Sequence, residues 1–116
     1  MKLLIAGSRD IENFELEKYI PDDVELIISG GAKGVDTLAE KIADKRKISK
    51  LIMRPNYARY GKGAAIIRNH KMVDIADRVV LLWNGSSRGT KQTLDYAKAQ
   101  GKPVTLINLG ECTDKL

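Results

Sequence analysis

The chain has 116 residues, of which 43% are hydrophobic and 30% are charged, and its formal net charge is +5. This length and balance fit one folded domain, which excludes a second catalytic domain and a disordered chain. No apolar run approaches the roughly 18 residues of a membrane span, and the start has no signal-peptide pattern. The one cysteine and one histidine disfavour an internal disulfide framework and a structural zinc site. We therefore expect a cytoplasmic protein that has no membrane partner, no bound metal and no cofactor.

Five short apolar segments are predicted to form β-strands. In chain order they cover 2–6, 24–28, 50–53, 78–83 and 103–109. Three of them are almost entirely apolar, which is typical of parallel strands that are covered on both faces.

Helical patterns lie between these strands. The first lies around 16–20, and the clearest covers 35–43, where apolar residues recur at i, i+3, i+4, i+7 and i+8. Two further helices are expected over about 63–76 and about 90–100, the second ending at a glycine shortly before a proline.

Strands that alternate with helices favour right-handed crossovers and a parallel sheet. We therefore predict an α/β fold, a Rossmann-like three-layer sandwich with a central parallel sheet of about five strands. The nucleotide-binding domain is expected to span 1–109, followed by a short C-terminal tail over 110–116.

In such a sheet, ligands bind beyond the carboxyl ends of the strands, near the switch in strand order. The first of three polar loops at such ends reads G-S-R-D, at 7–10. Gly7 allows a tight turn, Ser8 can hydrogen-bond an anion, and Arg9 can clamp a phosphate. The alternative is an ordinary turn in which Asp10 caps a helix.

The second loop reads S-G-G-A-K-G-V-D, at 29–36, and leads into the clearest helix. Paired glycines allow close approach of a ligand, and the free N–H groups of a helix N-terminus favour a phosphate. Asp36 either accepts a bond from a ribose hydroxyl or only stabilises the helix dipole. The spacing matches neither the dinucleotide fingerprint G-x-G-x-x-G nor a Walker loop.

The third loop reads N-G-S-S-R-G-T, at 84–90, between the fourth strand and the last helix. Its glycines and hydroxyl groups are typical of a phosphate-binding loop, and the alternative is a flexible connection with Thr90 as the helix N-cap. Two such loops at adjacent strand ends predict one site for a nucleotide or phosphosugar.

Positive charge is concentrated in 41–71, which holds ten Lys or Arg residues and one acid. This indicates an anionic partner, although the lysine-rich part near 45–50 also fits a solvated helix end. Within the stretch, Tyr57 and Tyr60 can stack on a base and neighbouring cations can meet phosphate. The alternative is a surface loop whose tyrosines pack on the body of the domain.

Together these segments resemble the SLOG superfamily, and most closely its small YspA-like, YpsA-related proteins, over about residues 2–109. The motifs that carry the resemblance are A-G-S-R-D at 6–10, S-G-G-A-K-G-V-D at 29–36, P-N-Y-A-R-Y-G-K-G-A at 55–64, R-N-H-K-M at 68–72, A-D at 76–77 and G-S-S-R-G-T at 85–90. The resemblance implies a Rossmann-like domain that binds a nucleotide-derived ligand as a sensor, with a possible homodimer. The superfamily also includes Smf/DprA-type DNA-processing proteins and LOG-type phosphoribohydrolases.

The resemblance to the LOG-type enzymes is incomplete at the catalytic position. Their arginine in an R-x-x-x-M helix motif corresponds to Arg68, the candidate catalytic residue, and their P-G-G-x-G-T loop corresponds to 85–90. Their catalytic glutamate corresponds to Thr93, which cannot supply the carboxylate that glycosidic cleavage needs. We therefore expect binding without LOG-type hydrolysis, unless Asp10 or Asp36 faces the ribose.

The leading hypothesis is a nucleotide-binding ligand sensor. The alternatives are a LOG-type nucleoside monophosphate phosphoribohydrolase and a single-stranded DNA-binding protein. The scarcity of aromatic residues argues against the DNA-binding protein. The predicted nucleotide- and phosphate-binding residues are Gly7, Ser8, Arg9, Gly30, Gly31, Ala32, Gly34, Asp36, Arg68, Asn69, Gly85, Ser86, Ser87, Gly89 and Thr90.

Overall fold

The fold is built on one parallel sheet, which a computed structural model describes for residues 1–109 of the chain. The predicted tail over 110–116 lies outside the described residues. The strands, in the sheet order β3-β2-β1-β4-β5, have these bounds: β1 Lys2–Gly7, β2 Leu26–Ser29, β3 Ser49–Ile52, β4 Arg78–Trp83 and β5 Val104–Asn108. All pairings are parallel, with Leu4 of the central strand opposite both Ile28 and Val79.

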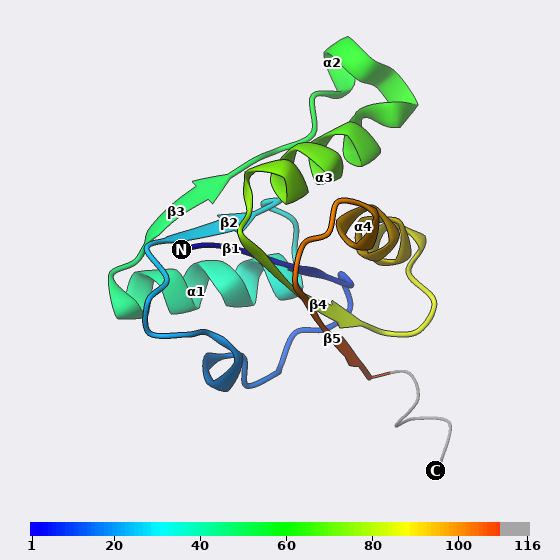
Figure 1. Ribbon diagram of the computed structural model, residues 1–116. Helices are drawn as coiled ribbons and strands as arrows, with labels where there is room; N and C mark the ends of the chain where they lie inside the picture. Colours follow the sequence, from blue (N-terminus) through cyan, green and yellow to red (C-terminus); the bar gives the residue numbers. More distant parts are fainter. Residues whose placement is uncertain (110–116) are drawn as a thin grey trace.

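Helices cover both faces of this sheet. Figure 1 shows α1 on one side of the strands and α3 and α4 on the other, with the short α2 at the far end of α3. Their bounds are α1 Val35–Arg46, α2 Tyr57–Tyr60, α3 Ala64–Ile75 and α4 Arg88–Ala99. Within the described part of the chain, none of the helices combines the length and apolar character that crossing a bilayer requires. The three layers confirm the predicted Rossmann-like α/β sandwich.

The apolar strands pack on both faces because successive side chains point to opposite sides of a sheet. Leu3 and Ile5 belong to the buried cluster that includes Val35 of α1. Leu4 belongs to the second cluster, which includes Val73 of α3 and Leu94 of α4. The near-continuous apolar runs in the sequence thus reflect two separate cores.

The helix predicted around 16–20 is wrong. The connection from β1 to β2 contains only a single 3-10 turn, η1 (Glu17–Tyr19). Ile20 has an extended backbone and precedes Pro21, and a proline disfavours the helical region for the residue before it. Leu16 and Ile20 are still buried against the α1 layer, which explains their helix-like spacing.

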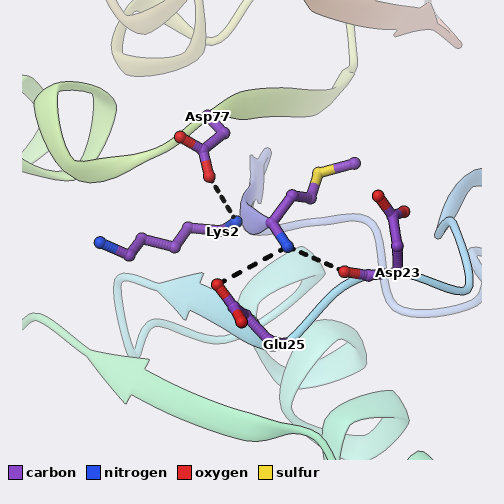
Figure 2. A network of polar contacts seen from close by, with 5 residues as sticks. Lys2, Asp23, Glu25 and Asp77 are labelled. Carbon is purple, nitrogen blue, oxygen red and sulfur yellow. Dashed lines mark hydrogen bonds and ion pairs between the residues drawn. The ribbon is translucent and has the colours of Figure 1, made fainter.

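Polar contacts fix the amino end of β1, as Figure 2 shows. The Met1 ammonium donates to the Asp23 carbonyl oxygen at 2.8 Å and lies 3.7 Å from the Glu25 carboxylate. The Lys2 N–H donates to Asp77 Oδ2 at 2.8 Å, and the Asp77 N–H donates to the Lys2 carbonyl at 2.8 Å. These contacts hold β1 in register at the end of the sheet remote from the polar loops.

The strand order places the topological switch beside β1. The chain moves from β1 to β2 and β3 on one side, then returns to β4 on the other. The loops that follow β1, β2 and β4 therefore leave three adjacent strands at the same edge. This is the edge at which open α/β sheets bind ligands.

Candidate functional site

A cavity of about 430 Å³ opens beyond the carboxyl ends of β1 and β4. The loops after β1, β2 and β4 line it, together with α3 and the first turns of α4. We call it the central cavity. The two glycine-rich loops of the sequence prediction thus reach one edge of the molecule.

The loop after β1 is held by the loop after β4. Ser8 is 2% exposed, its N–H donates to the Leu82 carbonyl at 3.0 Å, and its Oγ accepts the Asn84 N–H at 3.0 Å. Asp10 caps no helix in the described residues, so the alternative of an ordinary turn in which Asp10 caps a helix is wrong. Its carboxylate accepts the Asn84 side-chain amide at 3.1 and 3.2 Å. Both residues line the central cavity while joining the two loops.

Asn84 organises the loop after β4 from within. Its Oδ1 accepts the N–H groups of Ser86 and Ser87, each at 2.9 Å. The N-cap of α4 is Ser87, whose Oγ accepts the Thr90 N–H at 3.3 Å, so the expectation of Thr90 as the N-cap is wrong. The Gly89 N–H lies in the first helical turn, where it has no intrahelical acceptor, and Gly89 lines the cavity.

An internal carboxylate closes the loop after β2. Asp36 is 7% exposed, and its Oδ2 accepts the Ala32 N–H at 3.0 Å. The Gly31 N–H donates to Ser29 Oγ at 3.3 Å. Burial raises the pKa of the Asp36 carboxyl, while the hydrogen bond from Ala32 and the charge of Arg68 act in the opposite direction. Amide groups that the sequence assigns to a phosphate are therefore already bonded to Asp36 and Ser29.

Arg68 connects α3 to the ends of two strands. Its Nη1 donates to the carbonyl oxygens of Gly30 at 2.8 Å and Met53 at 3.1 Å, and its Nε donates to Asn69 Oδ1 at 2.8 Å. Burial lowers the pKa of the guanidinium, and the charge of Asp36 opposes that shift. A Cβ on Gly30 would lie 2.6 Å from Arg68 Nη1, so glycine is what allows this close approach.

The structure brings together two thirds of the predicted site residues. Those that line the central cavity are Gly7, Ser8, Arg9, Ala32, Asp36, Arg68, Asn69, Ser87, Gly89 and Thr90. Gly30 and Gly31 line a neighbouring hollow, and Gly34 lines a third with Leu38 and Lys41. Gly85 and Ser86 do not line the central cavity.

The prediction left out six residues that complete the lining: Ala6, Asp10, Ala65, Met72, Asn84 and Thr93. Asn84 could have been found, because Asn-Gly directly after a strand is a typical turn in which the asparagine bonds the backbone. Thr93 donates to the Gly89 carbonyl at 2.9 Å. Among residues 1–109, the carboxylates that line this cavity are those of Asp10 and Asp36.

The neighbouring hollow has a volume of about 420 Å³ and shares three residues with the central cavity. We call it the basic hollow. It is lined by Arg9, Gly30, Gly31, Ala32, Lys33, Arg54, Pro55, Tyr57 and Arg68. Arg9, Ala32 and Arg68 are common to both, so the two spaces are adjacent at this wall.

The segment expected as a loop over the site folds into α2 and a 3-10 turn, η2 (Gly61–Gly63). Asn56 starts α2 by accepting the Arg59 N–H at 3.1 Å on its Oδ1. The Tyr60 ring lies 5.3 Å from the charged groups of both Arg59 and Lys71. Tyr57 is 55% exposed and lines the basic hollow, so the two tyrosines have different surroundings.

The fold and this edge of the sheet define a Rossmann-like α/β domain with a polar cavity at its topological switch. No model of a known protein family matches the chain, and neither the curated proteins nor the solved structures contain a significant match. Among residues 1–109, no group of three His, Cys, Asp or Glu side chains is placed to hold a metal ion.

Proposed function

We propose that the chain binds a nucleotide or a nucleotide-derived phosphorylated ligand in the central cavity. The observation that carries the proposal is the convergence of three polar loops, from β1, β2 and β4, on one cavity at the switch point. Its volume of about 430 Å³ lies in the range of small-molecule sites.

The lining offers partners for both halves of such a ligand. The carboxylates of Asp10 and Asp36 accept hydrogen bonds, as ribose hydroxyl groups require. Arg9 is a cationic donor suited to a phosphate, and the Gly89 N–H at the start of α4 is a further donor to the ligand. Asn69 adds an amide that both donates and accepts.

The resemblance to the SLOG superfamily supports a sensing role. Three of the motifs that carry it, at 6–10, 29–36 and 85–90, form the loops at this edge of the sheet. A sensor requires selective binding but no turnover. The absence of a carboxylate at Thr93, where LOG-type enzymes place their glutamate, is consistent with binding alone.

Isothermal titration calorimetry with a panel of nucleosides, nucleoside mono- and diphosphates, cyclic nucleotides and ADP-ribose tests the proposal. We expect at least one compound to bind with a submillimolar Kd, and Asp36→Asn to weaken that binding at least about tenfold by removing a charged acceptor. Asp22→Asn, an exposed change at the opposite end of β2, is the matched control. Failure of the entire panel to bind would overturn the proposal.

A second candidate function, N-glycosidic hydrolysis of nucleoside monophosphates, is favoured by one observation. Asp10 and Asp36 both line the central cavity beside Arg68, so a carboxylate is available although Thr93 is not one. Burial raises the pKa of Asp36, which suits a group that takes the proton of an attacking water as the base departs from the ribose.

Incubation with nucleoside monophosphates, followed by chromatography for the free base and ribose phosphate, tests this reaction. Any activity should be lost in both Asp36→Asn and Asp10→Asn if these carboxylates carry it. Release of base that persists in the double variant would contradict the assignment, and no release by the wild type would leave binding as the function.

A further inference from the structure

The basic hollow is lined by four cationic side chains, those of Arg9, Lys33, Arg54 and Arg68, and by no carboxylate. None of the four forms an ion pair within 4.0 Å in the described part of the chain, where the ion pairs involve Met1 and three other lysines. Four positive charges with no carboxylate in the same lining make this hollow of about 420 Å³ an electrostatically favourable place for an anion, although the charge of Asp36 in the central cavity acts on one of them, Arg68.

Backbone carbonyl groups hold two of these cations without neutralising them. Arg54 Nη1 donates to the Gly31 carbonyl at 2.9 Å, and Arg68 Nη1 donates to the Gly30 carbonyl at 2.8 Å. Gly31 has φ +74°, and a Cβ there would lie 2.8 Å from Arg54 Nη1. The paired glycines therefore bring the two guanidinium groups against the backbone, where they are oriented before a ligand arrives.

Charge is divided between the two adjacent spaces. The central cavity contains Asp10 and Asp36, whereas the basic hollow contains neither, and Arg9 and Arg68 line both. A phosphate in the central cavity would be repelled by carboxylates that the basic hollow lacks. Among the amides of the loop after β4, those of Ser86 and Ser87 are already bonded to Asn84.

We propose that the basic hollow binds the pyrophosphate, or an equally charged phosphoanion, of a ligand whose hydroxyl-bearing part lies in the central cavity. This inference rests on the proposed function and gives it a ligand class. Nucleosides that carry two or more phosphates fit the site better than monophosphates. The anion contacts Arg54 and Lys33, and the shared residues Arg9 and Arg68 lie where the sugar joins the phosphate.

Inorganic pyrophosphate tests the anion site directly, with binding measured by calorimetry and by its ³¹P NMR shift. The double variant Lys33→Gln/Arg54→Gln removes two cations that line the basic hollow and do not line the central cavity. We expect pyrophosphate to bind the wild type and to bind the double variant at least about tenfold more weakly, as loss of charge-assisted hydrogen bonds predicts. Lys98→Gln, an exposed single charge loss at the end of α4, should change nothing.

The single variant Lys33→Glu separates a loss of binding from a loss of folding. We expect it to fold, because Lys33 is exposed and makes no hydrogen bond in the described structure. Reversing its charge should also weaken pyrophosphate binding at least about tenfold while circular dichroism stays unchanged. Equal binding of pyrophosphate by wild type and both variants, or no binding by the wild type, would overturn the anion site.

Nucleotides separate this inference from the proposed function. We expect the diphosphate of the preferred nucleoside to bind at least about tenfold more tightly than its monophosphate, and this ratio to approach one in Lys33→Gln/Arg54→Gln. Nucleotide binding that ignores these two residues would refute the basic hollow and leave the proposed function standing. Pyrophosphate binding without any nucleotide binding would refute the proposed function and leave the basic hollow standing as an anion site.

Discussion

Asp36 has a structural role in the loop after β2 and, in our proposal, a binding role as well. Burial raises its pKa above the ordinary value of 3.8, because removal from water disfavours the charged form. Between the unfolded and the folded pKa, the folded state binds more protons than the unfolded state. The contribution of Asp36 to stability is therefore greatest below the unfolded pKa and is lost as pH rises through the folded pKa.

Asp36→Asn should remove this pH dependence, since the amide stays neutral while its oxygen can still accept the Ala32 N–H. We expect the free energy of unfolding of the variant, relative to wild type, to increase as pH rises above 3.8. Urea unfolding at a series of pH values from about 3 to about 7 measures the difference. A difference that stays constant with pH would contradict the raised pKa.

Gly30 is constrained by its neighbours rather than by its own backbone conformation. A Cβ there would lie 2.6 Å from Arg68 Nη1 and 3.0 Å from Asp36 Oδ2, and both side chains are held by hydrogen bonds. We expect Gly30→Ala to lower the free energy of unfolding by about 1–3 kcal/mol, the usual cost of overpacking. Urea unfolding measures it.

Gly89→Ala is the matched control for that substitution. Nothing lies within 4 Å of a Cβ at Gly89, which is in the first turn of α4. Because alanine favours a helix over glycine, the variant should be as stable as the wild type or more stable by up to about 1 kcal/mol. Equal losses in the two variants would contradict the packing assigned to Gly30.

At the scale of elements, the loop after β4 depends on one side chain. Asn84→Ala removes the acceptor of the Ser86 and Ser87 amides and the donor to Asp10. We expect a loss of about 1–2 kcal/mol in the free energy of unfolding, since water replaces part of these bonds. Asn13→Ala, at an exposed asparagine, is the control, and an equal effect in both would refute this role of Asn84.

Local patterns were sufficient to predict the strands and the three long helices. The segment 78–83 was predicted with the bounds of β4 itself, because its apolar run ends where polar loop residues begin. The prediction of a helix around 16–20 is wrong because burial of Leu16 and Ile20 needs only one turn, and Pro21 ends that turn. Periodicity reports which residues are buried and does not alone report the backbone conformation.

Apart from the turn that Asn84 forms, the hydrogen bonds of the loops could not be predicted from the sequence. Ser8 and Asn84 are 76 positions apart, so their hydrogen bond follows from the parallel pairing of β1 with β4. Similarly, Asp36 lies in the first turn of α1, and its side chain folds back on the loop before it. The glycine pattern located the edge that holds the candidate site, while these longer-range contacts decide which donors face the cavity.

Across the whole molecule, the basic stretch 41–71 separates into two groups. Lys45, near the end of α1, pairs with Glu17 at 2.7 Å at the surface, as the solvated-helix interpretation predicts, whereas Lys50 belongs to β3 and pairs with Asp44 at 2.8 Å. Arg54 and Arg68 instead line the basic hollow at the carboxyl edge of the sheet. The positive charge that bears on our proposal is therefore the part that lies at this edge.

The most direct test of the central claim is an NMR titration of the ¹⁵N-labelled chain with the nucleotide that binds most tightly in the calorimetric panel. The account predicts that the amide signals of Arg9, Ala32 and Gly89 shift together with a single Kd, because all three loops contact one ligand. Shifts confined to one loop, or centred on the opposite end of the sheet near Asp22 and Arg46, would contradict it.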